Sequence, residues 1–365
     1  MTTANSEADR AVRSAGPGRS SGGPSPLRLP GGLSLRVERR AVAVGASLTV
    51  LAFALAVLLI GTGDFPIAPW DVLRTVLGDG TAADDFIVND LRMPRVLVAL
   101  LVGAALGMSG AVFQSVSRNP LGSPDLLGFG YGSAVGALAV IILFKGSAGE
   151  VAAGALAGGV LAGVAVYLLA YKKGVHGYRL VLVGIGASAV LLAVIQYLIT
   201  KAQLVEAGRA MVWLTGSLAG RDWAQVWPLL GLCAVLFPLV LVQGRALRLM
   251  EMGDDAAYAL GVRVERTRLL LMLSAILLTT AASAAAGPIS FVALAAPQLV
   301  RRLTRSPGGN LLTAALMGAV LLLGSDLASQ RVFGSDQLPV GVVTGLVGGV
   351  YLLWLLVTER RAGRI

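Results

Sequence analysis

The stretch RMPRVLVALLVGAALGMSGAVFQSVSRNPLGSPDLLGFGYGSAVGA, residues 92–137, contains two apolar runs joined by a polar turn. The first run has no charged residue between Arg95 and Arg118. A helix needs about 20 predominantly apolar residues to cross a bilayer core of about 30 Å. The stretch therefore predicts two membrane-spanning helices, separated by a proline-broken turn at residues 118–124.

The rest of the chain repeats this pattern. Of its 365 residues, 56% are hydrophobic and 14% are charged, and the mean hydropathy is +0.78. Soluble globular chains carry about 25% charged residues, and the short alternating strands of a membrane β-barrel are not visible in the sequence. The expected fold class is an all-α polytopic membrane protein with about ten transmembrane helices. The expected spans are 41–61, 93–114, 126–144, 151–171, 179–200, 224–243, 268–286, 288–300, 311–328 and 339–357.

The remaining segments divide the chain into three parts. Residues 1–40 are rich in Gly, Ser, Pro and Arg, which predicts a disordered basic tail. This tail is too long and too polar to begin a typical signal peptide, so an uncleaved first helix is expected after it. Residues 41–357 form the membrane domain, and residues 358–365 form a second tail. The one cysteine, Cys233, lies in an apolar run and is expected to be buried without a disulfide.

Loop charges predict the orientation of the helices. With the N-terminus in the cytoplasm, the inner segments hold 22 of the 30 Lys and Arg residues, and the outer segments hold 11 of the 20 acidic residues. Because cytoplasmic loops carry an excess of Lys and Arg, both termini are expected in the cytoplasm. The net charge of +10 then reflects basic loops beside anionic lipid, and no nucleic-acid partner is expected.

Two function classes lack the residues that they need. A secondary carrier usually places ionisable groups at membrane depth, and an intramembrane hydrolase needs a catalytic or metal-binding set. The span interiors are nearly free of such groups, and the only histidine, His176, falls in a loop, where a solvated side chain is a simpler interpretation than a metal ligand. The sequence also has no G-x-x-x-x-G-K-[ST] phosphate loop, so it is not expected to hydrolyse ATP by that route alone.

A short polar helix is predicted in the longest cytoplasmic loop, at residues 253–262 (GDDAAYALGV). Asp254 and Asp255 fall in its first turn, where acidic side chains favour the positive end of the helix dipole, and Gly261 suits a C-terminal stop. The residues at helical spacing on one face are small or apolar: Ala256, Ala259 and Leu260. Such a face allows the close approach of another protein surface; an amphipathic linker lying on lipid is the alternative.

The sequence resembles the permeases of ATP-binding-cassette importers for iron–siderophore complexes, haem and vitamin B12. The resemblance covers about residues 90–357 and begins with the stretch at 92–137. Later blocks follow in the same order: LVLVGIGASAV, MVWLTGSLAGRDWAQV, GDDAAYALGV, GPISFVALAAPQLVRRLT and LPVGVVTGLVGGVYLLWLL. The ending is especially similar to one of the two subunit types of ferric enterobactin permeases, whereas the basic N-terminal tail has no counterpart.

The resemblance implies a ten-span subunit in a bacterial cytoplasmic membrane, paired with a second permease subunit. We expect that subunit to be a related chain rather than a second copy. Two cytoplasmic ATPase subunits, which bind ATP and Mg²⁺, and an external substrate-binding lipoprotein are also implied. This chain is expected to bind no cofactor or metal of its own. The expected cargo is a ferric siderophore; haem or vitamin B12 is the alternative within the family, and a secondary carrier is the alternative outside it.

The resemblance also implies roles for individual residues. The polar helix would be the coupling helix that lies in a cleft of the ATPase: Gly253, Asp254, Asp255, Ala256, Ala257, Tyr258, Ala259, Leu260 and Gly261. The residues that dock the binding protein would be Arg92, Arg95 and Arg331, although Gln330 stands where the family often has an arginine. The translocation pathway would be lined by Gln196, Tyr197, Thr200 and Gln203. The inner gate would be formed by Gly174, Val175, His176 and Gly177.

Most of these roles have a structural alternative. Arg92 and Arg95 can be interfacial snorkelling residues, although they lie on the outside against the loop-charge trend. The polar residues of the fifth span can hydrogen-bond neighbouring helices. The arginines around the polar helix suit an ATPase rim or lipid headgroups equally: Arg245, Arg248, Arg263 and Arg266. The glycines at 128–137 and 341–350 are expected to form seams for close helix contact.

Overall fold

The computed structural model describes residues 26–28, 34–36, 39–171, 177–306, 308, 310–332 and 338–361. The chain divides into two compact units, residues 1–43 and 44–365. In the first unit, strands β1 (Pro26–Arg28) and β2 (Ser34–Arg36) pair antiparallel, with Leu27 opposite Leu35. These strands differ from the irregular tail that the sequence predicts, because two short segments of it pair with each other through their backbones. Residues 1–25 lie outside the described residues.

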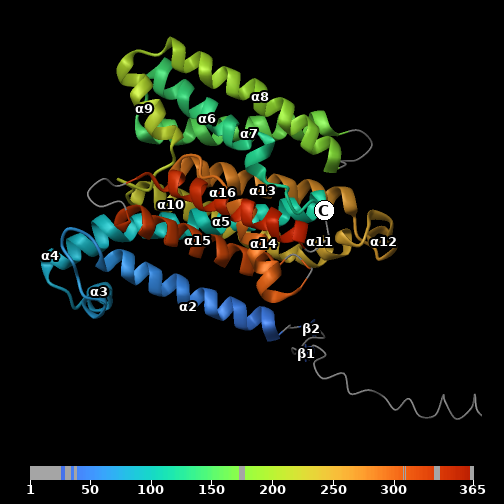
Figure 1. Cartoon of the computed structure of the whole chain (residues 1–365), viewed down its shortest axis with the longest axis horizontal. Coiled ribbons are helices and arrows are strands. Elements are labelled where there is room, and N and C mark those ends of the chain that lie inside the picture. Colours follow the sequence, from blue (N-terminus) through green and yellow to red (C-terminus); the bar gives the residue numbers. More distant parts are fainter. Residues whose placement is uncertain are drawn as a thin grey trace, which may run out of the picture. The chain divides into compact units, whose positions relative to one another are not determined.

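Helices make up the membrane domain, in agreement with the expected fold class (Figure 1). The first half contains α2 (Arg39–Gly61), α3 (Pro69–Val76), α4 (Ala82–Asp85), the π-helix η1 (Phe86–Arg92), α5 (Met93–Ser117), the 3₁₀ helix η2 (Pro124–Leu127), α6 (Phe129–Ala139), the π-helix η3 (Val140–Phe144), α7 (Ala148–Ala170) and α8 (Gly177–Lys201). The second half contains α9 (Leu204–Leu214), α10 (Trp223–Val242), α11 (Gly244–Glu251), α12 (Asp254–Ala259), α13 (Val264–Ala286), α14 (Val292–Thr304), α15 (Leu311–Arg331) and α16 (Val340–Arg361).

Seven helical segments among the described residues are long and apolar enough to cross a membrane. They are Arg39–Gly61, Ala82–Ser117, Ala148–Ala170, Gly177–Lys201, Trp223–Val242, Val264–Ala286 and Leu311–Arg331. Two shorter apolar helices cover Phe129–Phe144 and Val340–Trp354. A helix lies at each of the expected positions, but α14 has only 13 residues. The membrane class is confirmed, whereas the count of ten spans and the cytoplasmic termini stay predictions.

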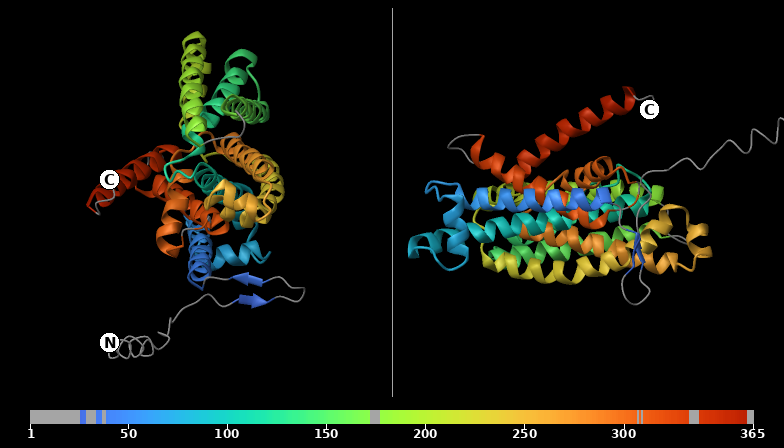
Figure 2. Two further views of the ribbon diagram at one scale, coloured as in Figure 1. Left: turned by 90° about the vertical axis from the view of Figure 1, so that its right-hand side faces the viewer. Right: turned by 90° about the horizontal axis from the view of Figure 1, so that it is seen from below.

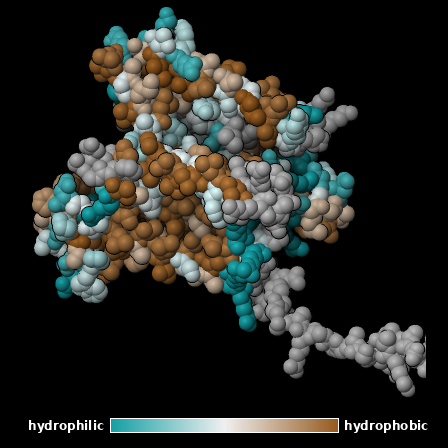
Figure 3. Space-filling model, in the orientation of Figure 1, coloured by the Kyte–Doolittle hydropathy of each residue, from teal (hydrophilic) through white to brown (hydrophobic). Residues whose placement is uncertain are grey.

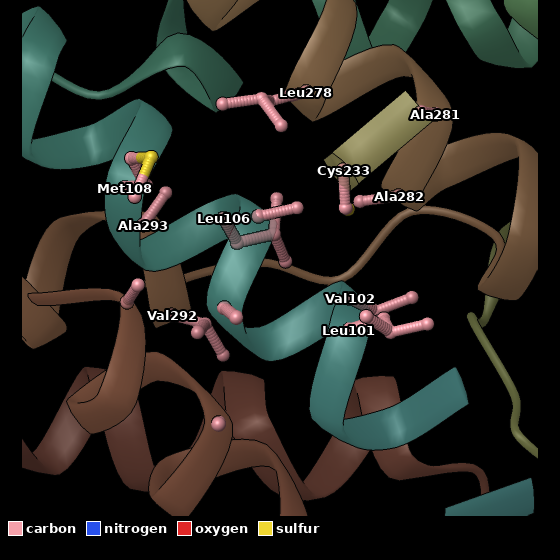
Figure 4. Close-up of a cluster of buried hydrophobic side chains, with 14 of the residues drawn as sticks. Leu101, Val102, Leu106, Met108, Cys233, Leu278, Ala281, Ala282, Val292 and Ala293 are labelled. Atoms are coloured by element: carbon pink, nitrogen blue, oxygen red, sulfur yellow. The ribbon is translucent and has the colours of Figure 1, made fainter. Parts of the chain in front are cut away.

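Helix α5 forms the centre of the bundle and packs against α10, α13, α14 and α15. Its neighbours come close because small residues meet at the contacts. A Cβ placed on Gly107 would overlap the carbonyl oxygen of Ala314, and one placed on Gly103 would overlap that of Gly318. Without a hydrophobic driving force between helices in lipid, such close packing is what holds membrane helices together. Figure 4 shows this core around α5, with Cys233 buried as a free thiol, as the sequence predicts.

Helices α6, α7 and α8 form a second group, drawn in green beside α13 in Figures 1 and 2. Glycines of α6 and α7 meet face to face: a Cβ on Gly136 would overlap the carbonyl oxygen of Gly154. Helix α7 then packs on α13, where Gly163 lies against Ile276. The predicted glycine seam at residues 128–137 is therefore confirmed.

The polar side chains gather toward the ends of the helices. In Figure 3, apolar residues cover the visible flanks of the bundle, and hydrophilic residues lie near the end that carries α3 and α4. Helix α12 lies at the opposite end of the bundle (Figure 1). The bundle therefore has two polar ends separated by an apolar band, as a membrane-spanning protein requires.

Candidate functional site

A cavity of about 660 Å³ opens between α6, α8, α16 and the segment that precedes α14. Most of its lining is apolar and comes from residues such as Ala134, Leu192, Ile289 and Val342. The polar lining residues come from five different segments: Ser123, Asp125, Tyr131, Thr215, Ser283 and Ser290. Scattered hydroxyl groups on an apolar wall provide weak contacts without a fixed binding centre, which suits the passage of a bulky ligand.

Asp125 of η2 is the one carboxylate in the described lining of this cavity. Its Oδ2 atom accepts a hydrogen bond from the Ser123 hydroxyl at 3.2 Å, and the backbone N–H of Phe291 also stabilises its charge. Burial has the larger effect and raises the pKa of Asp125 to about 6. The carboxyl group is therefore held in a site that favours its neutral form.

Phe291 joins Asp125 to the start of α14. Its φ of 69° lies in the left-handed region, which a bulky residue adopts only when surrounding contacts enforce it. One such contact is visible on α16, where a Cβ on Gly348 would overlap the Phe291 ring. The break after Gly287 thus places the Pro288–Phe291 segment on the cavity wall between η2 and α16.

The four predicted pathway residues lie beside the cavity rather than in its lining. Helix α8 contributes Leu192 and Ile195 to the lining, whereas Gln196, Tyr197 and Thr200 are exposed. The Thr200 hydroxyl donates to the Gln196 carbonyl at 2.8 Å, and Gln203 is the N-cap residue of α9. Residues four apart lie on the same face of a helix. Gln196 and Thr200 therefore lie on the same face of α8 as the lining residue Leu192, one and two turns further along the helix.

The predicted inner gate is described only at its last residue. Gly174, Val175 and His176 lie outside the described residues, and Gly177 begins α8. A Cβ on Gly177 would lie 2.6 Å from the Ser117 carbonyl oxygen, so this glycine allows α8 to touch the end of α5. The gate itself stays a prediction.

The predicted polar helix is confirmed as α12, bounded by two glycines with positive φ. Gly253 has a φ of 126° and Gly261 has a φ of 82°, values that favour glycine. The side chains that face outward are Asp255, Tyr258, Ala259 and Leu260. Tyr258 is 55% exposed and Leu260 is 62% exposed, which makes α12 a partly apolar surface at a polar end of the bundle.

Ala257 does not belong to this outward face, and its expected contact with an ATPase is wrong. The side chain is fully buried and packs with Met250 and Val264. Because α12 has only six residues, its one inward position is the residue that attaches it to α11 and α13. Ala257 therefore supports the helix from beneath.

Four charged residues hold the first turn of α12 in place, and we call them the Asp254 cluster: Arg118, Asp254, Glu265 and Arg268. The Arg118 and Arg268 guanidinium groups contact the two carboxylate oxygens of Asp254 at 2.5 and 2.8 Å. Arg268 is 4% exposed and also donates to Glu265 at 2.8 Å. Burial alone would raise the pKa of Asp254, but the two arginines outweigh it and hold that pKa below its usual range.

The predicted docking arginines lie at the opposite end, near α3 and α4, and two of them have partners within the chain. Arg92 donates to the carbonyl oxygens of Ile60 and Phe65 at 2.6 and 2.7 Å. Arg95 binds the fully buried Asp326 through Nε and Nη2, at 3.1 and 2.8 Å. Arg331 is exposed at the last position of α15. The contacts give Arg92 and Arg95 a structural role that the sequence did not indicate, and docking stays a prediction.

Sequence reasoning missed most of the cavity lining. The missed residues come from three distant regions of the chain, and each looks like an ordinary loop or helix residue by itself: Asp125, Tyr131, Thr215, Ser283 and Ser290. One signal was present, since Gly287-Pro288 breaks the helical pattern and a broken helix at membrane depth is tolerated only where it lines a cavity or is buried. The partners of the other residues depend on how the helices pack.

Comparison with known proteins agrees with this architecture. The FecCD transport family matches residues 48–358. The chain is 47% identical over 290 residues to the ferric enterobactin transport system permease protein FepG of Escherichia coli, covering 80% of this chain and 88% of that protein. It is 33% identical over 329 residues to the vitamin B12 import system permease protein BtuC of Citrobacter koseri, covering 89% and 97% of the two chains.

A solved structure of an inward-facing metal-chelate type ABC transporter shares the fold, with a TM-score of 0.76 and 26% identity. The alignment covers 87% of this chain and 99% of that chain. The relatives are membrane permease subunits rather than enzymes. With a family match that spans nearly the whole membrane domain, the chain belongs to the FecCD transport family of ABC-importer permeases.

Proposed function

We propose that the chain is a transmembrane subunit of an importer that moves ferric siderophores across a bacterial cytoplasmic membrane, driven by separate ATPase subunits. The observation that carries this proposal is the cavity of about 660 Å³ in a bundle of this family. Its apolar wall with scattered hydroxyls suits a large chelate that must pass without strong retention. The transport direction and energy source follow from the likeness to ABC-importer permeases.

A second permease subunit would complete the pathway. Helix α8 is exposed along much of its length, with Ile185, Val190 and Tyr197 at 57%, 65% and 62%. These side chains lie on the same helix as the cavity residues Leu192 and Ile195. We expect a related permease chain on this side, so that the pathway runs between two subunits.

The ATPase partner would bind at α12. Tyr258, Ala259 and Leu260 form a small, partly apolar outward surface, while Asp255 adds a charge at its edge. A helix of this size fits a shallow cleft on a soluble protein, and its buried side is fixed to α11 and α13. We assign the coupling role to this face, with ATP and Mg²⁺ held by the partner.

The external binding lipoprotein would dock at the opposite end. Arg331 is exposed there, and Arg92 and Arg95 lie at the start of α5 with part of their hydrogen-bonding capacity used internally. Arginine forks suit carboxylates on a partner surface. Because Asp326 already neutralises much of Arg95, Arg331 and Arg92 are the stronger candidates for contact.

The cargo is assigned by similarity to the enterobactin relative, and vitamin B12 is the second candidate because a B12 permease covers more of the chain at lower identity. The test uses proteoliposomes that contain this chain with its partner permease and ATPases. We expect ATP-dependent accumulation of iron-55 siderophore when a loaded siderophore-binding protein is added. Accumulation of labelled cobalamin instead would reassign the cargo, and uptake that needs a proton gradient but no ATP would refute the function.

A further inference from the structure

The strongest unassigned feature of the chain is the position of Arg118. This residue is the C-cap of α5, the central helix, and its φ of 50° lies in the left-handed region. Its Nε and Nη2 atoms donate to the Met250 carbonyl oxygen at 3.1 and 2.6 Å. Nη2 also contacts Asp254 at 2.5 Å. One side chain thus ties the end of α5 to the end of α11 and to the first turn of α12.

The contacts of Arg118 continue into the turn that follows it. Five residues further on, Ser123 and then Asp125 line the cavity. The Pro120 carbonyl oxygen accepts a hydrogen bond from Gln298 of α14 at 2.5 Å, and Asp125 is held by the Phe291 backbone. The turn at 118–125 is therefore fixed at one end to α12 and at the other end to the cavity wall.

We propose that Arg118 is a positioning residue that transmits displacement of α12 to the cavity wall through the turn at residues 118–125. The inference rests on the proposed function, because it assumes that an ATPase moves α12. Motion passes from one helix to another only through short, directional contacts, and the contacts of Asp254 with two arginines are of this kind. Arg268 fixes the other oxygen of Asp254 at 2.8 Å, so α12 and the N-terminus of α13 move together with Arg118.

The contacts around Arg118 allow this residue to be changed without unfolding the bundle. Arg118 is 44% exposed and Asp254 is 34% exposed, so the pair lies at the surface of the bundle, where its contribution to global stability is small. Arg268 is nearly buried and keeps Asp254 in place even without Arg118. Removing the Arg118 guanidinium should therefore separate the turn from α12 without removing α12 from the bundle.

The experiment compares Arg118→Gln with wild type in the reconstituted complex, measuring siderophore taken up per ATP hydrolysed. We expect this ratio to fall about fivefold, the change in an equilibrium constant that corresponds to losing an ion pair of ~1 kcal/mol. Basal ATPase activity without binding protein should be retained, whereas its stimulation by the loaded binding protein should be lost, because in this proposal that stimulation reaches α12 through the same contact of Arg118. A merely structural defect would lower both ATPase activities together.

Four further variants make the test decisive. Arg118→Lys keeps the charge beside Asp254 and should recover part of the ratio. Glu206→Gln breaks an ion pair of 3.2 Å with Lys145, far from α12, and should leave the ratio unchanged. The double variant Arg118→Gln/Asp254→Asn should lower the ratio by less than the two single changes predict when their effects are added, because both changes remove the contact between Arg118 and Asp254.

The outcomes separate this inference from the proposed function. If wild type shows no ATP-dependent uptake, the proposed function fails and the variants are not needed to decide it. If wild type transports and Arg118→Gln retains the wild-type ratio and stimulation, the link through Arg118 is refuted. If Arg118→Gln fails to assemble, Arg118→Lys decides: a ratio below that of wild type supports the proposal, and a wild-type ratio with wild-type stimulation refutes it. The proposal is also refuted if Arg118→Gln/Asp254→Asn shows both the wild-type ratio and wild-type stimulation.

Discussion

At the scale of single residues, two carboxylates that lie among the helices differ in how their charge is compensated. Asp326 has no exposed surface and is neutralised by Arg95 in a forked contact. Asp125 faces the cavity with only a hydroxyl and a backbone N–H as partners. Burying a charge is costly unless it is paired. Asp326 has an arginine as its charge partner, whereas Asp125 has none among these partners and takes up a proton more readily.

The raised pKa of Asp125 predicts a pH-dependent stability. The folded protein binds the proton more tightly than the unfolded chain, so the stabilisation is present below about pH 4, the usual range of aspartate. It is lost as the pH rises through about 6. The Tm of wild type minus that of Asp125→Asn, measured in detergent, should therefore fall between these two pH values and then level off. Parallel Tm curves would show that Asp125 ionises normally.

The pairing of Arg95 with Asp326 predicts a large effect of breaking it from one side. Arg95→Ala leaves a fully buried carboxylate without its charge partner and should destabilise the bundle by about 3 kcal/mol. Arg95→Ala/Asp326→Ala removes both charges and should recover part of that loss. Thermal unfolding of the purified subunit measures both, and equal stability of the single variant and wild type would contradict the role.

At the scale of elements, the shape of α12 follows from its length. A helix of six residues cannot bury a full apolar stripe, so one alanine anchors it and its other face stays exposed. The helix is oriented by the charges of the Asp254 cluster in addition to apolar burial. The two faces of α12 therefore have different functions, which substitutions can separate.

Ala257 and Ala259 form a matched pair for that test. Ala257→Arg places a cation in a fully buried site and should lower the yield and Tm of the subunit. Ala259→Arg changes the exposed face and should leave the fold intact while strongly reducing ATPase binding and uptake. Expression and Tm are measured first, then copurification of the ATPase. Normal ATPase binding by a folded Ala259→Arg subunit would exclude that face as the coupling surface.

The seam between α5 and α15 is a second element with a sharp prediction. Gly107→Ala forces a methyl group against the Ala314 carbonyl oxygen and should cost about 1–3 kcal/mol through overpacking. Gly231→Ala lies in α10, where an added Cβ meets no atom within 4 Å, and should be neutral or stabilising. Thermal unfolding distinguishes the two variants. Equal Tm values would mean that α15 moves away from the added methyl group at no cost, which would contradict the prediction.

At the scale of the whole molecule, the two features that suggest function are the cavity and the exposed, partly apolar face of α12. Both adjoin the turn after α5, the most deeply buried of the candidate spans. The end of the bundle that carries α3 and α4 lies away from α12 (Figure 1). Charges there would affect encounter with an outer partner rather than the internal link.

Docking is therefore tested best at Arg331, which is exposed, rather than at Arg95, whose change would disturb the fold. Arg331→Glu replaces attraction with repulsion toward carboxylates and should slow association of the binding protein, mainly at low salt. Basal ATPase activity should remain at the wild-type level. Association rates are measured at low and high salt, and an unchanged low-salt rate would exclude Arg331 from the interface.

The sequence by itself determined the membrane class, the positions of the long apolar helices, the buried cysteine and the short polar helix with its glycine ends. These features depend on local composition and on period, which neighbouring residues in the chain define. Only the tertiary structure decided that Ala257 faces inward, that Arg95 pairs with Asp326, and that Asp125 reaches the cavity beside Phe291. Those contacts join residues that are distant in the chain. They depend on which helices pack together and on the rotation of each helix about its axis. Side-chain volumes and the closeness of the backbones fix these two features only when the whole bundle has assembled.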